Sequence, residues 1–495
     1  MTTGRKNELS RRGILSFLLL SVANIGISKT VGNSIGSIPR PNLFDKKKLE
    51  IQSLVSRLPR GSNITFSVAD RTTGEILETY NPELSLPPAS VIKTITSFYA
   101  LENLGPDFRF NTQLISTGVI TNGVLDGDLI LVGEGDPTLD TDGLYDLVKL
   151  LKERGVSKIS GDFKVYGGGM PSIHEIDPTQ PNYLAYNPSI SGMNLNANRV
   201  FFQWKLKNNN YDLFVEARGL KARPTVDLVE VILSQRVSPV FEYNMVLGKE
   251  TWSVAKRALG DKGGRWLPVR QPQLYSGQVF QKIATAFGIT MPLPTVSYGP
   301  PDGYVLEIHQ SKNLREITQS MLKYSDNLSA EALGIKASLK FQEVDSLASS
   351  AQMMALWLKL NYGLMSASFV DHSGLSDKSI ISSNELVKFL IQNPVHNRIK
   401  PLLKEMTHRN IKGKVVQNSE IKVSVKTGTL HFSSALVGYI DKPSGRDLAF
   451  SISMSDMEKR QNLTQAEKEN PRGSQRWVNQ VREIQRRLVD RWCRL

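Results

Sequence analysis

Polar and apolar residues alternate along two short stretches near the start of the chain. These stretches cover residues 63–68 and 75–80, and Thr72-Thr73-Gly74 lies between them. Alternation with a period of two is typical of strands that bury one face, and glycine with threonine favours a turn. The pattern therefore predicts two neighbouring β-strands.

The pattern changes after Pro87-Pro88, where a long apolar run begins. From Ala89 to Leu101 apolar side chains fall on nearly all sides of a helical turn, which predicts a buried helix. Ser90 would lie at its N-terminus, where backbone N–H groups point outward and favour negative charge. Lys93 would lie beside it one turn on. Burying a lysine inside an apolar helix costs free energy, which favours a functional role for this residue.

The second half of the chain mixes helical and strand patterns. Helical periodicity covers residues 314–324 and 328–339, with a short loop between them. Strand patterns cover residues 421–425, 435–440 and 448–454, and the first ends at Lys426-Thr427-Gly428. This mixture predicts an α+β fold, an α/β sandwich in which an antiparallel sheet lies between helices.

Three short strings in one order carry the candidate chemistry. They are Ser90-Val91-Ile92-Lys93, Ser325-Asp326-Asn327 and Lys426-Thr427-Gly428. Together they match the S-x-x-K, S-x-N and K-T-G set of serine enzymes that form an acyl-enzyme with β-lactams or D-alanyl peptides. S-x-x-K also occurs at Ser253, Ser320 and Ser419, and S-x-N at Ser311 and Ser382, whereas K-T-G occurs once. The order of the strings and their local context must therefore decide which copies belong to the site.

Ser253 is the main rival for the nucleophile, because it also precedes the other two strings. Its charged neighbours predict a solvated surface helix over residues 249–257. Ser320 lies too close to Ser325, and Ser419 lies beyond the S-x-N string. For Ser90 itself the alternative is a plain helix cap.

The other two strings supply the remaining parts of an acyl transfer. The Ser325 hydroxyl could relay a proton to the leaving amine, and the Asn327 amide could bind a peptide carbonyl. Lys426 and Thr427 combine a charge with a hydroxyl donor, which suits a carboxylate, and Gly428 would let a ligand backbone approach. The alternatives are an ordinary turn or helix cap at residues 325–327 and an exposed lysine before a turn at Lys426.

With these strings the chain resembles the class C low-molecular-mass penicillin-binding proteins, the D-alanyl-D-alanine carboxypeptidases/endopeptidases with a long inserted region. Residues 131–139 and 186–196 are similar to two further segments of that family. Residues 371–376 resemble its Asp-Gly-Ser-Gly-Leu-Ser loop, with His372 in place of the usual glycine. The gap of more than 200 residues between Lys93 and Ser325 also fits that family, because smaller β-lactamase-type enzymes place these strings much closer together.

The resemblance implies a penicillin-binding/β-lactamase-like transpeptidase catalytic domain made of residues 44–105 and 303–495, with a mainly β insertion at residues 106–302. It makes Ser90 the nucleophile, Lys93 the general base and Ser325 the proton shuttle. Asn327 would orient the substrate, and Lys426 with Thr427 would hold its terminal carboxylate. The N–H groups of Ser90 and Thr429 would form the oxyanion hole. We add the hypothesis that Lys426 helps to depress the pKa of Lys93.

Composition removes several other classes of chemistry. The 495 residues include one cysteine, Cys493, and six scattered histidines, so no disulfide framework, structural zinc cluster or metal mechanism is expected. No cofactor motif is present. The net charge of +14 favours anionic partners such as cell-wall polymer or a membrane surface, while no nucleic-acid module is visible.

Both ends of the chain carry localisation signals. Ser10-Arg11-Arg12-Gly13 is a twin-arginine pattern followed by a short apolar stretch, so residues 1–28 are expected to be an export signal and residues 29–43 a linker. The enzyme would then act in the periplasm or another extracytoplasmic space. At the other end, residues 477–495 form a basic amphipathic pattern that could contact a membrane surface. The family layout favours the alternative, a helix packed on the catalytic sheet.

The resemblance predicts hydrolysis of D-Ala-D-Ala ends and D-alanyl cross-links of peptidoglycan stem peptides through a Ser90 acyl-enzyme, with β-lactams as covalent inhibitors. Two alternatives remain. One is the same machinery with another substrate, as in a β-lactamase or a D-amino-acid esterase or amidase. The other is a non-catalytic wall-binding or β-lactam-sensing protein.

Overall fold

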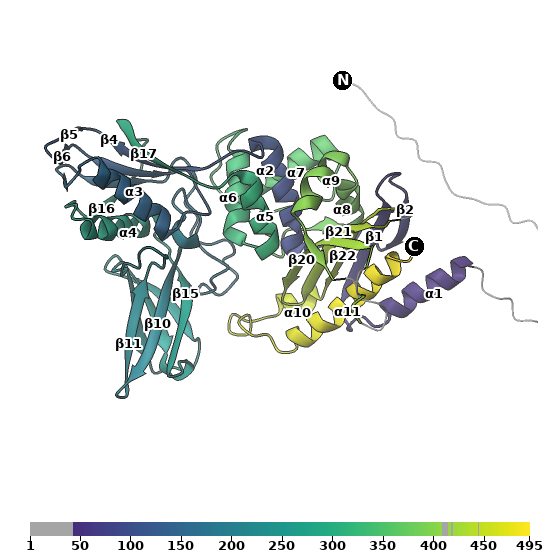
Figure 1. The fold of residues 1–495 in the computed structure, drawn as a ribbon. Helices are drawn as coiled ribbons and strands as arrows, with labels where there is room; N and C mark the ends of the chain where they lie inside the picture. Colours follow the sequence, from purple (N-terminus) through teal and green to yellow (C-terminus); the bar gives the residue numbers. More distant parts are fainter. Residues whose placement is uncertain (1–42, 408–413, 417–418, 444) are drawn as a thin grey trace, which may run out of the picture. The chain divides into compact units, whose positions relative to one another are not determined.

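The computed structural model describes residues 43–407, 414–416, 419–443 and 445–495 (Figure 1). The predicted export signal and all but the last residue of the predicted linker lie outside these residues. The first helix, α1 (Leu43–Val55), opens the described chain. Residues 52–495 form one compact unit, and the following description concerns that unit.

Six antiparallel strands form the sheet that positions the candidate site, in the order β19-β20-β21-β22-β1-β2. They are β1 (Asn63–Asp70), β2 (Ile76–Tyr80), β19 (Lys404–Met406), β20 (Lys422–Leu430), β21 (Ser433–Asp441) and β22 (Leu448–Ser455). β1 pairs with β22 along its whole length, so the two ends of the chain share one sheet. The strands predicted from alternation are confirmed, but K-T-G lies inside β20 and not at its end, because pairing with β21 continues to Leu430.

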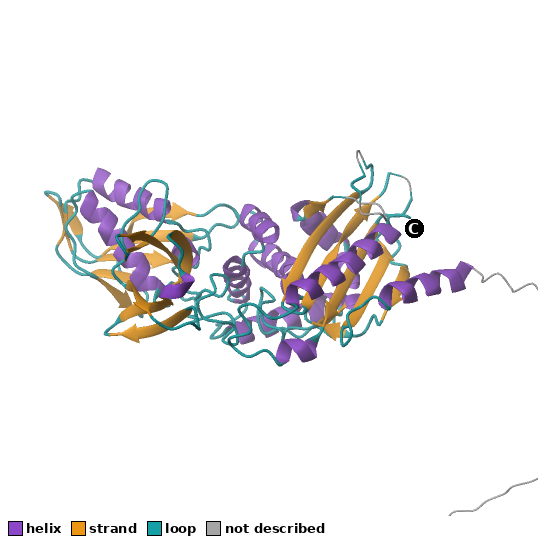
Figure 2. Ribbon diagram, turned by 90° about the horizontal axis from the view of Figure 1, so that it is seen from below, coloured by secondary structure: helices purple, strands orange, loops and turns teal. Residues whose placement is uncertain are grey.

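Helices cover both faces of this sheet (Figures 1 and 2). The helices of this part of the chain, not all of which lie on the sheet, are α2 (Lys93–Leu104), α5 (Leu314–Tyr324), α6 (Asn327–Ser338), α7 (Leu347–Tyr362), α8 (Ser383–Leu390), α9 (Asn393–Ile399), α10 (Met457–Gln461) and α11 (Ser474–Trp492). Alternation along β1 separates the faces. Thr65 and Ser67 hydrogen-bond Ser383 of α8, whereas Phe66 between them contacts Trp492 of α11. Adjacent strand residues point to opposite faces, so α8 and α11 lie on opposite sides of the sheet.

The C-terminal helix α11 packs on the sheet with its apolar face. Trp477, Val481, Ile484, Leu488 and Trp492 are all buried, and the Trp492 ring lies 5.5 Å from that of Phe450. The alternative in which this apolar face contacts a membrane is therefore wrong. Among the described residues, no helix has the length and apolar character needed to cross a bilayer.

The region of the chain between α2 and α5 is rich in strands. A mixed sheet contains β16 (Pro294–Ser297), β9 (Phe163–Tyr166), β7 (Leu129–Gly133), β4 (Asn111–Ser116) and β17 (Tyr304–Gln310), and it is accompanied by α3 (Thr141–Glu153) and α4 (Pro272–Ala286). Three smaller sheets are formed by β5 (Val119–Thr121), β6 (Val124–Asp126) and β8 (Lys158–Ile159); by β10 (Arg199–Lys207), β11 (Asn210–Glu216) and β15 (Lys262–Pro268); and by β12 (Val229–Ser234), β13 (Phe241–Val246) and β14 (Lys249–Ala255). Outside this region, β3 (Ser85–Leu86) pairs with β18 (Ile381–Ser382). The α+β class is confirmed.

This strand-rich region leaves and rejoins the rest of the chain at one place. β4 and β17 pair antiparallel, and next to them the Ser311 N–H donates to the Phe110 carbonyl at 2.9 Å. The Phe110 N–H donates in return to Ser311 Oγ, also at 2.9 Å. The predicted limits of the catalytic and inserted parts stay predictions.

The rival S-x-x-K string at Ser253 does not lie on a surface helix, and that prediction is wrong. Ser253 lies on β14, the central strand of its sheet, and is 9% exposed. Its hydroxyl accepts a hydrogen bond from Arg236 Nη1 at 2.6 Å. Of the charges that suggested a helix, Lys249 and Glu250 are the first two residues of the strand, and Lys256 and Arg257 follow it. Trp252 and Val254 are fully buried, as suits aromatic and β-branched residues in a sheet.

Candidate active site

Ser90 and Lys93 lie where a tight turn passes into α2. Ser90 is in a 3₁₀ turn, Ala89–Ile92, and Lys93 is the first residue of α2, so the α-helix begins later than predicted. Ala89 adopts a φ of 45°, a left-handed conformation that costs an alanine about 1 kcal/mol. Lys93 Nζ lies 2.9 Å from Ser90 Oγ.

Lys93 is buried and its amine meets three oxygens. Besides Ser90 Oγ, Nζ donates to Asn327 Oδ1 at 2.8 Å and to the Ser373 carbonyl at 2.7 Å. A neutral amine has two N–H donors and one lone pair. The two carbonyl-type oxygens accept only, so they take the donors and leave the lone pair facing the Ser90 hydroxyl. This is the arrangement in which an amine can remove a proton from that hydroxyl.

Burial shifts the proton equilibrium of Lys93 toward the neutral amine. Burial lowers the pKa of Lys93 to about 8, opposed by the negative charges of Glu331, Asp371 and Asp326. A lysine in bulk water titrates above pH 10. The group is therefore deprotonated in a far larger fraction of molecules near neutral pH than a surface lysine.

Ser325 and Asn327 lie on either side of the joint between α5 and α6. Ser325 ends α5 in the left-handed conformation, with a φ of 62°, and the Asp326 side chain caps α6 by accepting from the Ser329 N–H at 2.7 Å. The predicted helix-cap alternative is thus correct for this string, and it coexists with the site geometry. Asn327 Nδ2 donates to the Tyr186 carbonyl at 2.8 Å, which fixes the orientation of its amide toward Lys93.

Lys426 projects from β20 to the same place. Its Nζ donates to Ser325 Oγ at 3.0 Å and to the Thr427 carbonyl at 2.8 Å, and the residue is 3% exposed. Burial, followed by repulsion from Lys93, lowers the pKa of Lys426 to about 7. Repulsion between two ammonium groups is mutual, so a charge on Lys426 also disfavours the charged form of Lys93. The hypothesis that Lys426 helps to depress the pKa of Lys93 stays a prediction.

Gly428 explains how β20 can approach Ser90 so closely. A Cβ atom at this position would lie 2.8 Å from the Ser90 nitrogen and 2.9 Å from the Pro88 carbonyl, closer than real Cβ atoms approach such groups. Thr427 and Thr429, on either side, are exposed. The structure therefore brings the three strings to one crevice, while the oxyanion-hole roles of the Ser90 and Thr429 N–H groups stay predictions.

A buried carboxylate, missed in the sequence, holds the loop that supplies the Ser373 carbonyl. Glu331 accepts from the N–H groups of His372 and Ser373, each at 2.9 Å. Burial raises the pKa of Glu331. The available signal was a charged residue in the otherwise apolar run of α6, one turn after Asn327. Its partners, however, lie 41 and 42 residues away in sequence.

His372, to which the sequence assigned no role, is fully buried in the same loop. Its Nε2 lies 2.7 Å from Ser350 Oγ, and burial lowers the pKa of the imidazole to about 3, so it is neutral. Gly334 of α6 makes room for it, since a Cβ there would lie 2.2 Å from the ring. No cluster of three or more His, Cys, Asp or Glu side chains able to hold a metal occurs in the described part of the chain.

Comparison with known families decides the membership of the chain. The model of the D-Ala-D-Ala carboxypeptidase 3 (S13) family matches residues 48–472. The chain belongs to this S13 peptidase family.

Curated relatives and a solved structure agree with the S13 assignment. The chain is 24% identical over 427 residues to the D-alanyl-D-alanine carboxypeptidase DacB of Haemophilus influenzae, covering 81% of this chain and 87% of that protein. It is 26% identical over 483 residues to the D-alanyl-D-alanine carboxypeptidase of Actinomadura sp. strain R39, covering 91% and 88%. The crystal structure of penicillin binding protein 4 from Haemophilus influenzae has the same fold, with a TM-score of 0.70, 21% identity, and coverage of 90% and 99%.

In this S13 peptidase the crevice opens into a cavity of about 410 Å³. Ser90, Ser325 and Asn327 line its floor. Its walls include residues from distant segments, namely Gln180 and Tyr186 before the K-T-G strand and Arg460 and Arg482 after it. None of these wall residues was assigned a role in the site from the sequence, although Tyr186 and Arg482 lie in segments noted there for other reasons.

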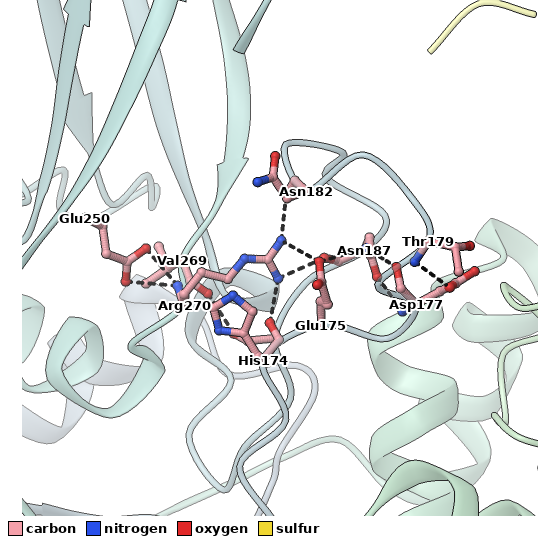
Figure 3. Close-up of polar contacts among 10 residues, drawn as sticks. His174, Glu175, Asp177, Thr179, Asn182, Asn187, Glu250, Val269 and Arg270 are labelled. Carbon is pink, nitrogen blue, oxygen red and sulfur yellow. Dashed lines mark hydrogen bonds and ion pairs between the residues drawn. The ribbon is translucent and has the colours of Figure 1, made fainter. Parts of the chain in front are cut away.

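Arg270 anchors the wall segment that carries Gln180 and Tyr186 (Figure 3). Its guanidinium is buried and donates to the carbonyls of His174 at 2.6 Å, Asn182 at 2.6 Å and Asn187 at 3.1 Å. On the other side, the Arg270 backbone N–H donates to the Glu250 carboxylate, whose pKa burial raises to about 7. Arg270 thus ties three points of the segment to β14, through its side chain on one side and its backbone N–H on the other.

Proposed function

We propose that this chain is a serine D-alanyl-D-alanine carboxypeptidase that acts on peptidoglycan through an acyl-enzyme at Ser90. The observation that carries the proposal is the contact of Lys93 Nζ with Ser90 Oγ, Asn327 Oδ1 and the Ser373 carbonyl, at 2.9, 2.8 and 2.7 Å. That geometry, with a lowered lysine pKa, suits an amine that activates a hydroxyl. The family membership supports the substrate class.

In the acylation step, neutral Lys93 takes the Ser90 proton as Oγ attacks the carbonyl of the penultimate D-alanine. Asn327 orients the acyl chain, and the N–H groups of Ser90 and Thr429 stabilise the oxyanion. Ser325 passes a proton to the leaving amine, aided by Lys426, whose Nζ lies 3.0 Å from its hydroxyl. Lys426, Thr427 and Gly428 form the strand edge against which the leaving residue lies. Water then attacks the ester and releases the shortened peptide.

The same parts would serve two related reactions. A D-alanyl cross-link differs from a D-Ala-D-Ala end in its leaving amine, so endopeptidase cleavage needs no further catalytic group. β-Lactams would acylate Ser90 and remain attached as long as water fails to release them. We place these activities outside the cytoplasm, where peptidoglycan lies, and the net charge of +14 suits an anionic wall polymer.

Intact-mass spectrometry after incubation with penicillin tests the nucleophile. The wild type should gain the mass of one penicillin, and Ser90→Ala should gain none. Ser253→Ala is the matched control, since it removes the other S-x-x-K serine, and it should be labelled like the wild type. An adduct that persists in Ser90→Ala and disappears in Ser253→Ala would refute the assignment.

Turnover separates the proposed activity from the alternatives with the same machinery. We expect release of D-alanine from a diacetylated L-Lys-D-Ala-D-Ala tripeptide to exceed penicillin hydrolysis in turnover number. Faster turnover of penicillin would indicate a β-lactamase, and faster turnover of simple D-amino-acid esters an esterase. Acylation without turnover of any of these would indicate a β-lactam-sensing or wall-binding protein.

A further inference from the structure

The leaving residue of the proposed reaction carries a free α-carboxylate, which needs a positive charge in the cavity. Lys426 supplies this charge only in part. Its amine already donates to Ser325 Oγ and the Thr427 carbonyl, and burial lowers its pKa to about 7. A buried amine that already has two acceptors is a weak receptor for an anion.

Arg482 of α11 offers a permanent charge at the same crevice. Its side chain lines the cavity that contains Ser90, and its Nη2 donates to Thr429 Oγ1 at 3.1 Å. A guanidinium keeps its charge at any working pH and presents several donors in a plane that matches a carboxylate.

Arg482 also differs from its neighbours on the helix. Arg486 and Arg487, one turn on, both form ion pairs with Glu483. Within the described part of the chain, no carboxylate lies within 4 Å of the Arg482 guanidinium. The arginine that faces the cavity is thus left without an acidic partner of its own.

The position of Arg482 is set by rigid packing. Gln485, on the next turn of α11, is buried and its Nε2 donates to Ser434 Oγ at 3.2 Å. Ser434 lies opposite Thr429 in the β20–β21 ladder. The helix is therefore held in register with the strand, and residue 482 falls next to the Thr429 hydroxyl. The side chain itself is exposed, and its hydrogen bond to Thr429 directs its end toward the strand.

We propose that Arg482, with the Thr429 hydroxyl beside it, binds the free α-carboxylate of the residue that leaves on acylation. This rests on the proposed function and narrows its substrates to acyl-D-alanyl compounds whose leaving group carries a carboxylate near the scissile bond. D-Ala-D-Ala ends satisfy this requirement, as do cross-links whose leaving amine lies beside a free carboxylate. Amidated ends do not.

The test compares two thioesters that differ only in that carboxylate. An acyl-D-alanyl thioglycolate has it, and its methyl ester does not. In both, the thioester makes acylation fast enough to measure without relying on protonation of a leaving amine. The enzymes are wild type, Arg482→Ala, Arg482→Lys and the matched control Arg487→Ala, which removes a paired arginine of the same helix. Tm of each variant reports folding.

We expect Arg482→Ala to lower kcat/KM for the free acid about tenfold, the usual order for a lost charge-assisted hydrogen bond, with little change for the methyl ester. For the free acid, kcat/KM of Arg482→Lys should lie between those of the wild type and Arg482→Ala. Arg487→Ala should match the wild type on both thioesters. Equal losses on both thioesters, or no loss on either, would overturn the role of Arg482 while leaving acylation of Ser90 intact. Loss of acylation on both thioesters in the wild type itself would instead refute the proposed function.

Discussion

Lys93 is fully buried, and its polar contacts are an amide oxygen, a backbone carbonyl and the Ser90 hydroxyl. Burying an ammonium group is expensive, and proteins commonly relieve the cost by shifting the pKa until the group is neutral. Here the relief is partial, because nearby carboxylates hold the pKa near 8. The amine is therefore poised close to the pH at which a wall enzyme works.

The rate should follow the protonation of Lys93. A general base acts when unprotonated, so kcat/KM should be low in acid and rise with pH through an apparent pKa of about 8. In Lys426→Ala the midpoint should move to higher pH, because the variant removes a second cation that repels the charged form of Lys93. The measurement is the pH profile of thioester kcat/KM. An unchanged midpoint would refute the hypothesis that the Lys426 charge acts on Lys93.

Helix α6 presents one face to the loop at residues 371–376. Asn327, Glu331, Gly334 and Ser338 recur at helical spacing along this face. Asn327 contacts Lys93, Glu331 binds two N–H groups of the loop, and Gly334 admits the His372 ring. Ser338 continues the contact, accepting from Ser350, which in turn meets His372. The helix thus fixes the Ser373 carbonyl and the Asn327 amide as one unit.

Glu331→Gln tests this unit. A glutamine keeps one acceptor, so one N–H of the loop should lose its partner, at a cost of about 1–3 kcal/mol in unfolding free energy. The lost negative charge, which raises the pKa of Lys93, should also move the acid limb of kcat/KM to lower pH. Urea unfolding and the pH profile are the measurements.

The control for Glu331→Gln is Glu316→Gln, a change on α5 where an exposed glutamate closes a capping box. It should cost less stability and leave the pH profile in place. An unshifted acid limb in Glu331→Gln would mean that Glu331 is already protonated where Lys93 titrates.

Periodicity located most elements around the site. The predicted helix at residues 314–324 coincides with α5, and the strands that became β1, β20, β21 and β22 were all anticipated. The prediction of a surface helix at Ser253 was wrong because the strand β14 is buried on both faces. Such a strand lacks the alternation of polar and apolar residues that would reveal it. Glu331 and His372 have their partners far away in sequence, and the proposed role of Arg482 depends on a contact with another element, none of which a local pattern contains.

At the scale of the whole chain, the strand-rich region reaches the catalytic crevice through one segment. The Tyr186 carbonyl accepts from Asn327, and Gln180 and Tyr186 line the cavity. Arg270 holds this segment by three carbonyls (Figure 3). Substrate should therefore meet a wall whose position depends on a residue outside the cavity.

Arg270→Ala should displace this wall. Removing a buried arginine leaves its carbonyl partners unsatisfied, a loss of about 3 kcal/mol in unfolding free energy. We expect KM for the tripeptide to rise severalfold with a smaller change in kcat, because Ser90 and Lys93 stay in place. The control is Arg236→Ala, which removes hydrogen bonds to Ser253 and Pro239 and should lower Tm without raising KM. An equal rise of KM in both variants would contradict the wall interpretation.

The mutual hydrogen bonds of Phe110 and Ser311 close the chain at the point where the strand-rich region departs. A segment whose ends already touch can be exchanged for a longer or shorter one with a small entropic penalty, since loop closure depends only weakly on length. The architecture thus allows modular replacement, in which different accessory regions are grafted onto one catalytic scaffold. Any substitute must still bring a backbone acceptor to the Asn327 amide, and this contact limits which grafts preserve activity.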